Sequence, residues 1–123
     1  MSKILIVDDE PNLRLLYETE FQLAGYETRT AADAQAGLVI LDSWSPDLVI
    51  LDIRMSGMDG LETLQQILQR ERRVRVIFNT AFSSYRDNYL TWAADAYVTK
   101  SADVTELLDK VSELLQTELT AKQ

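Results

Sequence analysis

Short apolar runs alternate along the chain with longer stretches in which apolar residues recur every three or four positions. Continuous apolar runs between helical patterns are typical of buried parallel strands. The pattern predicts five strands, at Lys3–Val7, Glu27–Ala31, Leu48–Leu51, Val74–Asn79 and Ala96–Thr99. The strict alternation of strands and helices predicts a doubly wound α/β sheet with helices on both faces.

The segments between and after these strands predict five helices. The first begins near Pro11 and ends before Gly25, because proline is favoured in a first turn and glycine after a last one. Asp33 is placed to cap the second helix, since aspartate is among the preferred N-cap residues. The third follows a loop marked by Gly57 and Gly60.

The fourth helix is predicted from residues at helical spacing, and the fifth from a pattern typical of a helix N-terminus. A fourth helix is indicated by residues at helical spacing, Tyr85, Tyr89, Trp92 and Ala93. The fifth begins with a capping-box pattern of Asp103 and Glu106 and frays after Glu118. The positions expected to face the core in the other helices are Leu13, Leu16, Tyr17, Phe21, Ala24, Ala34, Gly37, Leu38, Leu41, Leu61, Leu64, Leu68, Val104, Leu107, Leu108, Val111, Leu114 and Leu115.

Length and composition narrow the class of protein. The 123 residues suit a single domain, 1–123, with a polar tail at 119–123. The chain has no cysteine, and its net charge of −8 argues against direct binding to nucleic acid. Because no uncharged stretch is long enough to span a bilayer, we expect no membrane partner and a cytoplasmic location. The chain also has no histidine, so it carries no phosphohistidine of its own.

Polar residues follow four of the predicted strands at their carboxyl ends. These are Asp8 and Asp9, Asp52, Thr80 and Lys100. In an open parallel sheet the ligand crevice lies at this edge, so the five side chains are expected to converge. Three close carboxylates repel one another, and a hard cation such as Mg²⁺ relieves that repulsion. Taken one at a time, each aspartate also fits a helix or turn cap, Thr80 a packing role and Lys100 a solvated surface role.

Together these groups suit the transfer of a phosphoryl group to a carboxylate. A metal ion and the lysine ammonium would stabilise the charge, and the Thr80 hydroxyl can donate to a phosphoryl oxygen. Position favours Asp52 as the acceptor, because it ends the central strand and precedes the glycine-containing loop 53–60.

Four segments carry a family resemblance: Ile4–Asp9, Asp47–Gly60, Val76–Ala81 and Tyr97–Lys100. They resemble the CheY-like receiver domains of response regulators in bacterial two-component signalling, over essentially the whole chain. The resemblance implies a flavodoxin-like sheet with strand order 2-1-3-4-5 and Mg²⁺ as cofactor. It implies a histidine kinase or histidine phosphotransfer protein as phosphoryl donor. It also implies no enzymatic activity beyond self-phosphorylation from a phosphodonor and slow hydrolysis of the aspartyl phosphate.

The resemblance assigns roles at the site. Asp52 is implied as the phosphoacceptor, and Asp9 and Asp52 as magnesium ligands together with the backbone carbonyl of Arg54. Asp8 is implied to act on the metal mainly through water. Lys100 is implied to contact the phosphoryl group.

Further roles concern the switch and its lifetime. Thr80 is implied as the switch hydroxyl and Tyr97 as the switch aromatic that turns inward with it. Output is implied through the face made by the fourth helix, the strand Ala96–Thr99 and the last helix. Trp92 and Tyr97 near that face are candidate docking residues because aromatics are enriched at binding hot spots, although packing on the sheet explains Trp92 at least as well. Arg54 and Phe82 stand where the family tunes phosphoryl lifetime, although a solvated arginine and an exposed aromatic explain them equally well.

Two positions depart from the family pattern. Ser101 follows Lys100 where the family usually has proline, and Ser56 replaces a common loop proline. A cis peptide is common before proline but costs roughly 2.5–4 kcal/mol without it. The sequence alone therefore does not determine the path of the backbone from Lys100 into the last helix.

Other classes remain as alternatives. A haloacid-dehalogenase-type phosphatase would place Asp-x-Asp after the first strand, where this chain has Asp8-Asp9-Glu10. A flavin-binding flavodoxin would need a phosphate-cradling loop there. A receiver-like module that is never phosphorylated is the third. Whether the chain is a stand-alone receiver or was cut from a longer regulator with an output domain, and which downstream protein it binds, the sequence leaves open.

Overall fold

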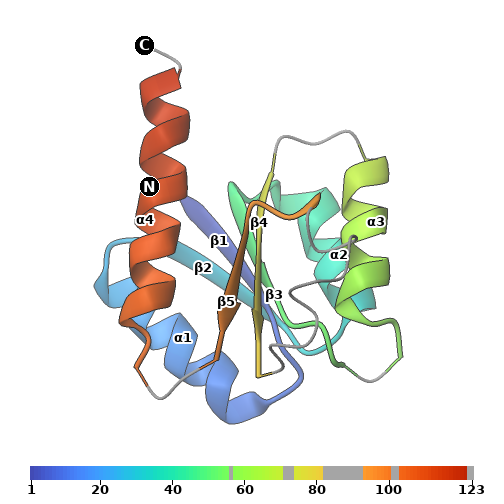
Figure 1. Ribbon diagram of the computed structural model, residues 1–123. Coiled ribbons are helices and arrows are strands. Elements are labelled where there is room, and N and C mark those ends of the chain that lie inside the picture. Colours follow the sequence, from blue (N-terminus) through green and yellow to red (C-terminus); the bar gives the residue numbers. More distant parts are fainter. Residues whose placement is uncertain (56, 71–73, 82–92, 101–102, 122–123) are drawn as a thin grey trace.

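The computed structural model describes residues 1–55, 57–70, 74–81, 93–100 and 103–121, with side chains as far as 116. Five parallel strands form one sheet in the order β2-β1-β3-β4-β5, as Figure 1 shows. This is the predicted flavodoxin-like order. The strands are β1 (Lys3–Val7), β2 (Glu27–Ala31), β3 (Leu48–Leu51), β4 (Arg75–Thr80) and β5 (Ala96–Thr99).

Four of the five strands have the predicted bounds, and β4 is displaced by one residue. It begins at Arg75 rather than Val74 and ends at Thr80 rather than Asn79. The backbone N–H of Arg75 donates to the carbonyl of Asp47, so pairing with β3 begins there. At the other end Thr80 still pairs with Thr99 of β5. The candidate switch hydroxyl therefore belongs to the strand itself.

The described helices are α1 (Pro11–Leu23), α2 (Ala34–Trp44), α3 (Gly60–Gln69) and α4 (Thr105–Ala121). The predicted helix at Tyr85–Trp92 lies outside the described residues, so α4 is the helix expected last. It runs past Glu118 to Ala121, where fraying was predicted. Asp33 caps α2 as predicted, accepting from the N–H of Ala36 at 2.8 Å.

Several details of the helices differ from the sequence prediction. Gly60 is the first residue of α3 rather than part of the preceding loop, because Asp59 caps the helix. Leu68 is 51% exposed and Ile67 is buried in its place. On α1, Leu16 is exposed and Ala24 follows the last turn. Asp103 accepts from the N–H and hydroxyl of Thr105, two residues on.

Apolar side chains pack on both faces of the sheet, which confirms the doubly wound arrangement. α1 and α4 cover one face, with Tyr17, Phe21 and Val111 in their core. α2 and α3 cover the other, with Leu38 and Leu64 among the residues of that core; Figure 1 shows the two pairs on opposite sides. No helix in the described part of the chain has the length and apolarity needed to cross a bilayer. Because the strands are parallel, their carboxyl ends all lie at one edge of the sheet.

Candidate phosphoryl-acceptor site

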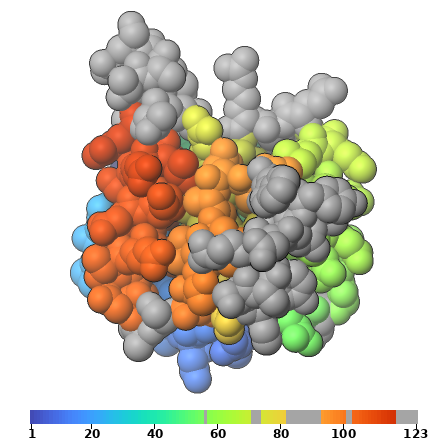
Figure 2. Space-filling view, in the orientation of Figure 1, coloured from blue at the N-terminus to red at the C-terminus, as the bar shows by residue number. Residues whose placement is uncertain are grey.

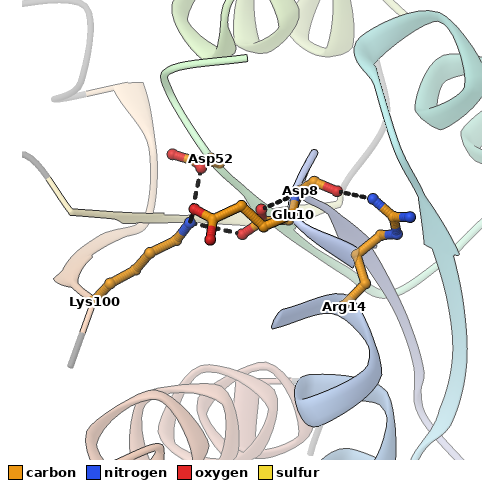
Figure 3. A network of polar contacts seen from close by, with 5 residues as sticks. All are labelled: Asp8, Glu10, Arg14, Asp52 and Lys100. Carbon is orange, nitrogen blue, oxygen red and sulfur yellow. Dashed lines mark hydrogen bonds and ion pairs between the residues drawn. The ribbon is translucent and has the colours of Figure 1, made fainter. Parts of the chain in front are cut away.

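Three site residues predicted from different strands meet at one ammonium group. The Lys100 Nζ lies 2.8 Å from Oδ2 of Asp8 and 2.8 Å from Oδ2 of Asp52. Asp8 directly follows β1, Asp52 directly follows β3 and Lys100 directly follows β5. Figure 3 shows the lysine side chain reaching between the two carboxylates. The site predicted from strand ends is therefore assembled around a lysine bridge.

This bridge is buried. The side chains of Lys100, Asp8 and Asp52 are 9%, 3% and 6% exposed. Buried charges are costly unless they are paired, and here one cation serves two carboxylates. Glu10 adds a third carboxylate, with Oε1 at 3.6 Å from the same Nζ, but its side chain is 62% exposed. The site therefore holds more negative than positive charge.

Burial and neighbouring charges shift the acidities of the bridge. Burial raises the pKa of Asp52, and the negative charge of Asp8 raises it further, while contacts with Lys100 and Thr80 act in the opposite direction. Burial by itself would lower the pKa of Lys100, but its hydrogen bonds with Asp52 and Asp8 prevail and raise the pKa. The lysine therefore stays protonated, and Asp52 is a stronger base than an ordinary aspartate.

The acidic groups have the composition of a metal site. Asp8, Asp9, Glu10 and Asp52 each place one carboxylate oxygen within 4.8 Å of the others. Oδ1 of Asp52 is buried and accepts no hydrogen bond from the part of the chain that is described. Hard cations such as Mg²⁺ take carboxylate oxygens, so the donor set fits the implied ion. The prediction that Asp8, Asp9 and Asp52 converge is confirmed.

Two residues near Asp8 were not singled out in the sequence. Arg14 of α1 donates from Nη1 to the carbonyl oxygen of Asp8 at 2.8 Å, as drawn in Figure 3. Glu10 donates its backbone N–H to Oδ1 of Asp8 at 3.0 Å and is the N-cap of α1, without a side-chain cap. Spacing indicated neither contact, because both depend on how the chain turns between β1 and α1.

The structure places three more of the predicted site residues, Thr80, Tyr97 and Arg54. Thr80 is completely buried at the end of β4, and its carbonyl accepts from the N–H of Lys100 at 2.7 Å. Tyr97 of β5 is partly buried, with its ring centroid 6.4 Å from that of Phe78. Arg54 is exposed. Phe82 lies outside the described residues, as do Trp92, Ser56 and Ser101.

The first residue of α3, Gly60, packs closely against the backbone of Asp52 and Ile53. Gly60 donates its N–H to the carbonyl of Ile53 at 2.7 Å. A Cβ atom built on Gly60 would lie 2.3 Å from the carbonyl oxygen of Asp52 and 2.6 Å from Cα of Ile53. Such contacts are too close for any side chain, so glycine lets α3 pack directly against the backbone of Asp52 and Ile53. The sequence marked Gly60 only as a loop signal.

The family follows from the sequence match. Residues 4–112 match the model of the response regulator receiver domain. The chain belongs to the response regulator receiver family. The sporulation initiation phosphotransferase F of Bacillus subtilis is 36% identical over 115 residues, which cover 92% of this chain and 93% of the relative. Regulatory protein AtoC of Escherichia coli is 37% identical and matches 100% of this chain but 27% of its own length.

Solved structures of receivers have the same fold. The response regulator TrrA of Thermotoga maritima, solved with Mg²⁺ and BeF, is 46% identical with a TM-score of 0.89, covering 93% of this chain and 99% of that one. TrrA in complex with the histidine kinase ThkA matches with a TM-score of 0.87 at 46% identity, covering 94% and 99%. The chain spans half or less of the regulators that head the sequence matches, for example 48% of the transcriptional regulator ycf27 of Cyanophora paradoxa.

Proposed function

We propose that this receiver domain is a phosphorylation switch that accepts a phosphoryl group on Asp52. The observation that carries the proposal is the state of the Asp52 carboxylate. One oxygen is held by Lys100 at 2.8 Å, while the other is buried without a hydrogen-bond partner among the described residues. A carboxylate so placed has one oxygen ready to bond to phosphorus or to bind a cation.

The phosphoryl donor in this proposal is a phosphohistidine of a histidine kinase or of a phosphotransfer protein. An oxygen of Asp52 attacks phosphorus, the phosphorus–nitrogen bond breaks, and the imidazole leaves with the electron pair of that bond. The ammonium of Lys100 balances charge on the phosphoryl oxygens, and the Thr80 hydroxyl donates to one of them. The complex of the kinase ThkA with TrrA supports this class of partner.

Magnesium is the cofactor in the proposal. Asp9 and Asp52 would hold it with the backbone carbonyl of Arg54, and Asp8 would act through water. Bound there, the ion would neutralise charge that develops on the phosphoryl group. The acidic cluster supports this assignment, and the relative TrrA was solved with Mg²⁺ and BeF.

The signal leaves the domain through β5 and α4 together with segment 82–92. Figure 2 shows β5 beside α4 on one face of the molecule, and Tyr97 of β5 connects that face to the core through Phe78. We expect a downstream protein or an attached output domain to bind there, in the cytoplasm and without direct contact to nucleic acid or membrane. Turnover of small substrates is not part of this function, apart from self-phosphorylation and slow hydrolysis of the product.

The test is intact-protein mass after incubation with acetyl phosphate, with and without Mg²⁺. We expect one phosphoryl adduct that requires Mg²⁺ and is absent from Asp52→Asn. The matched control is Asp42→Asn, because Asp42 is an aspartate far along α2 whose carboxylate pairs with Arg70. An adduct that persists in Asp52→Asn, or none with either acetyl phosphate or a phosphorylated histidine kinase, would refute the proposal.

A further inference from the structure

A second buried polar group lies just behind the site, on the opposite side of β4. Asn79 directly precedes Thr80, and its side chain is among the few polar ones in the core, 3% exposed. Successive residues of a strand point to opposite faces. Asn79 therefore faces α1 and α4, whereas Thr80 faces the other way. On that face Asn79 lines a small cavity together with Tyr17 from α1.

The side-chain amide of Asn79 is incompletely satisfied. Nδ2 of Asn79 has no hydrogen-bond partner within the described ranges. The side-chain amide nitrogen carries two hydrogens, so both of these donors lack a partner there. A buried donor without a partner destabilises a fold, and leucine at this position would avoid the loss. A polar residue kept at such a cost in stability calls for a role other than packing.

The cavity that Tyr17 and Asn79 share is small. It has a volume of about 10 Å³ and is lined by Tyr17, Asn79, Thr99 and Asp103 together with apolar residues of β5 and α4. That volume admits about one water molecule. The cavity thus lies between the strand end that carries Thr80, the strand end that carries Lys100 and the start of α4.

The pair is also connected to the reacting groups. Along the backbone, Asn79 is bonded to Thr80, whose carbonyl accepts the N–H of Lys100. Burial raises the pKa of Tyr17; the charge of Lys100 lowers that pKa, and the charges of Asp8 and Asp52 raise it. A change of charge at the site therefore changes the electrostatic potential at the Tyr17 hydroxyl. A displacement of Asn79 moves Thr80, the next residue of the chain.

We infer that Tyr17, Asn79 and one water in this cavity form a buried polar link that positions Thr80 and Lys100 for phosphoryl transfer. The inference rests on the proposed function. Tyr17 and Asn79 are positioning residues, since neither touches the reacting carboxylate. The link fixes the end of β4 against α1, and it holds the Thr80 hydroxyl and the Lys100 ammonium at the distances that the reaction needs.

The experiment compares Tyr17→Phe, Asn79→Leu and the double variant with wild type. The rate constants for phosphorylation by acetyl phosphate with Mg²⁺ are measured at 25 °C, where circular dichroism shows each protein folded. Each single variant should react about three- to tenfold more slowly, since small displacements of reacting groups cost rate steeply. The double variant should be no slower than the slower single one, because both substitutions break the same link. Asn79→Leu should melt no lower than wild type.

The matched control is Leu107→Met, which changes an apolar wall of the same cavity while conserving volume. It should react at the wild-type rate. Wild-type rates in Tyr17→Phe and Asn79→Leu would make the pair purely structural and overturn the inference; if Asn79→Leu does not fold, Tyr17→Phe alone decides. Absence of any phosphorylation in wild type would overturn the proposed function, and the inference with it.

Discussion

Replacing Gly60 with alanine probes the contact between α3 and Asp52, the proposed phosphoacceptor. The added Cβ would lie 2.3 Å from the Asp52 carbonyl oxygen and 2.6 Å from Cα of Ile53. Both are backbone atoms at the end of the central strand, so neither can move aside by rotating a side chain. To reach an ordinary contact of 3.4 Å, α3 and the Asp52 backbone must separate by about 1 Å.

The magnitude follows from two opposing effects. Overpacking a tight site costs roughly 1–3 kcal/mol and occasionally more, and a backbone obstruction belongs at the upper end. Alanine recovers up to about 1 kcal/mol relative to glycine in a helix. We expect a net loss of about 2 kcal/mol in the free energy of unfolding. For a chain of this length that lowers Tm by roughly 6–10 °C.

Function should suffer more than stability. A displacement of about 1 Å at a reacting group can reduce the rate on the order of 100-fold. Differential scanning calorimetry of Gly60→Ala gives the stability, and intact mass against time with acetyl phosphate and Mg²⁺ gives the rate constant below Tm. We expect the variant to be folded at 20 °C and to phosphorylate at least about tenfold more slowly.

The control is Gly57→Ala, in the loop that precedes α3. Gly57 has a φ of +79° but open space around its Cβ position, so alanine there meets only the left-handed backbone cost of about 1–2 kcal/mol. It should lower Tm without a comparable loss of rate. If Gly60→Ala has the Tm of wild type and is phosphorylated at the wild-type rate, the inference that α3 packs closely on Asp52 is wrong.

Three more predictions concern the charges of the site. In calorimetry, Mg²⁺ at about 100 times its Kd should stabilise the fold by about 2.7 kcal/mol, whereas Asp9→Asn should abolish most of that gain; no shift at millimolar Mg²⁺ would count against the cluster. Without metal, Asp52→Asn should be more stable than wild type at pH 7, because the raised pKa of Asp52 in the folded state means that folding disfavours its charged carboxylate. This gain in stability over wild type should appear as the pH rises through the ordinary aspartate pKa and level off above the raised pKa of the folded state. It should vanish at pH 3, where the carboxyl is protonated in both states. Lys100→Met leaves two buried carboxylates unpaired, so chemical denaturation without metal should show a loss of about 3–5 kcal/mol, and a loss under 1 kcal/mol would contradict the bridge.

The sequence predicted the fold well because each strand is a continuous apolar run with a clear end. Leu48–Leu51 is apolar throughout, and all four residues are buried. The prediction at Leu68 was wrong because leucine fits a helical stripe on pattern alone. Which side of α3 meets the sheet is set by the close approach of Gly60, and a periodicity of apolar residues carries no information about that contact.

The site was predictable as a set of residues and unpredictable as a network. Strand ends brought Asp8, Asp52 and Lys100 to one edge, and the structure confirms their meeting. The part of Arg14, which holds the carbonyl of Asp8, depends on a turn that no motif encodes. The buried pair of Tyr17 and Asn79 was missed because Tyr17 fits the apolar face of α1 and asparagine at a strand end reads as an ordinary terminating residue.

The lysine bridge ties the edge of the sheet to its centre. Lys100 directly follows β5, an outermost strand, yet its ammonium is held by Asp52 at the end of the middle strand. Binding equilibria at two linked places change each other by the same factor. If Asp52 is phosphorylated as proposed, a partner that displaces β5 on binding would shift the phosphorylation equilibrium by the same factor by which phosphorylation shifts the affinity for that partner. In such a domain the downstream partner that reads the phosphorylated state also influences how much of the domain becomes phosphorylated.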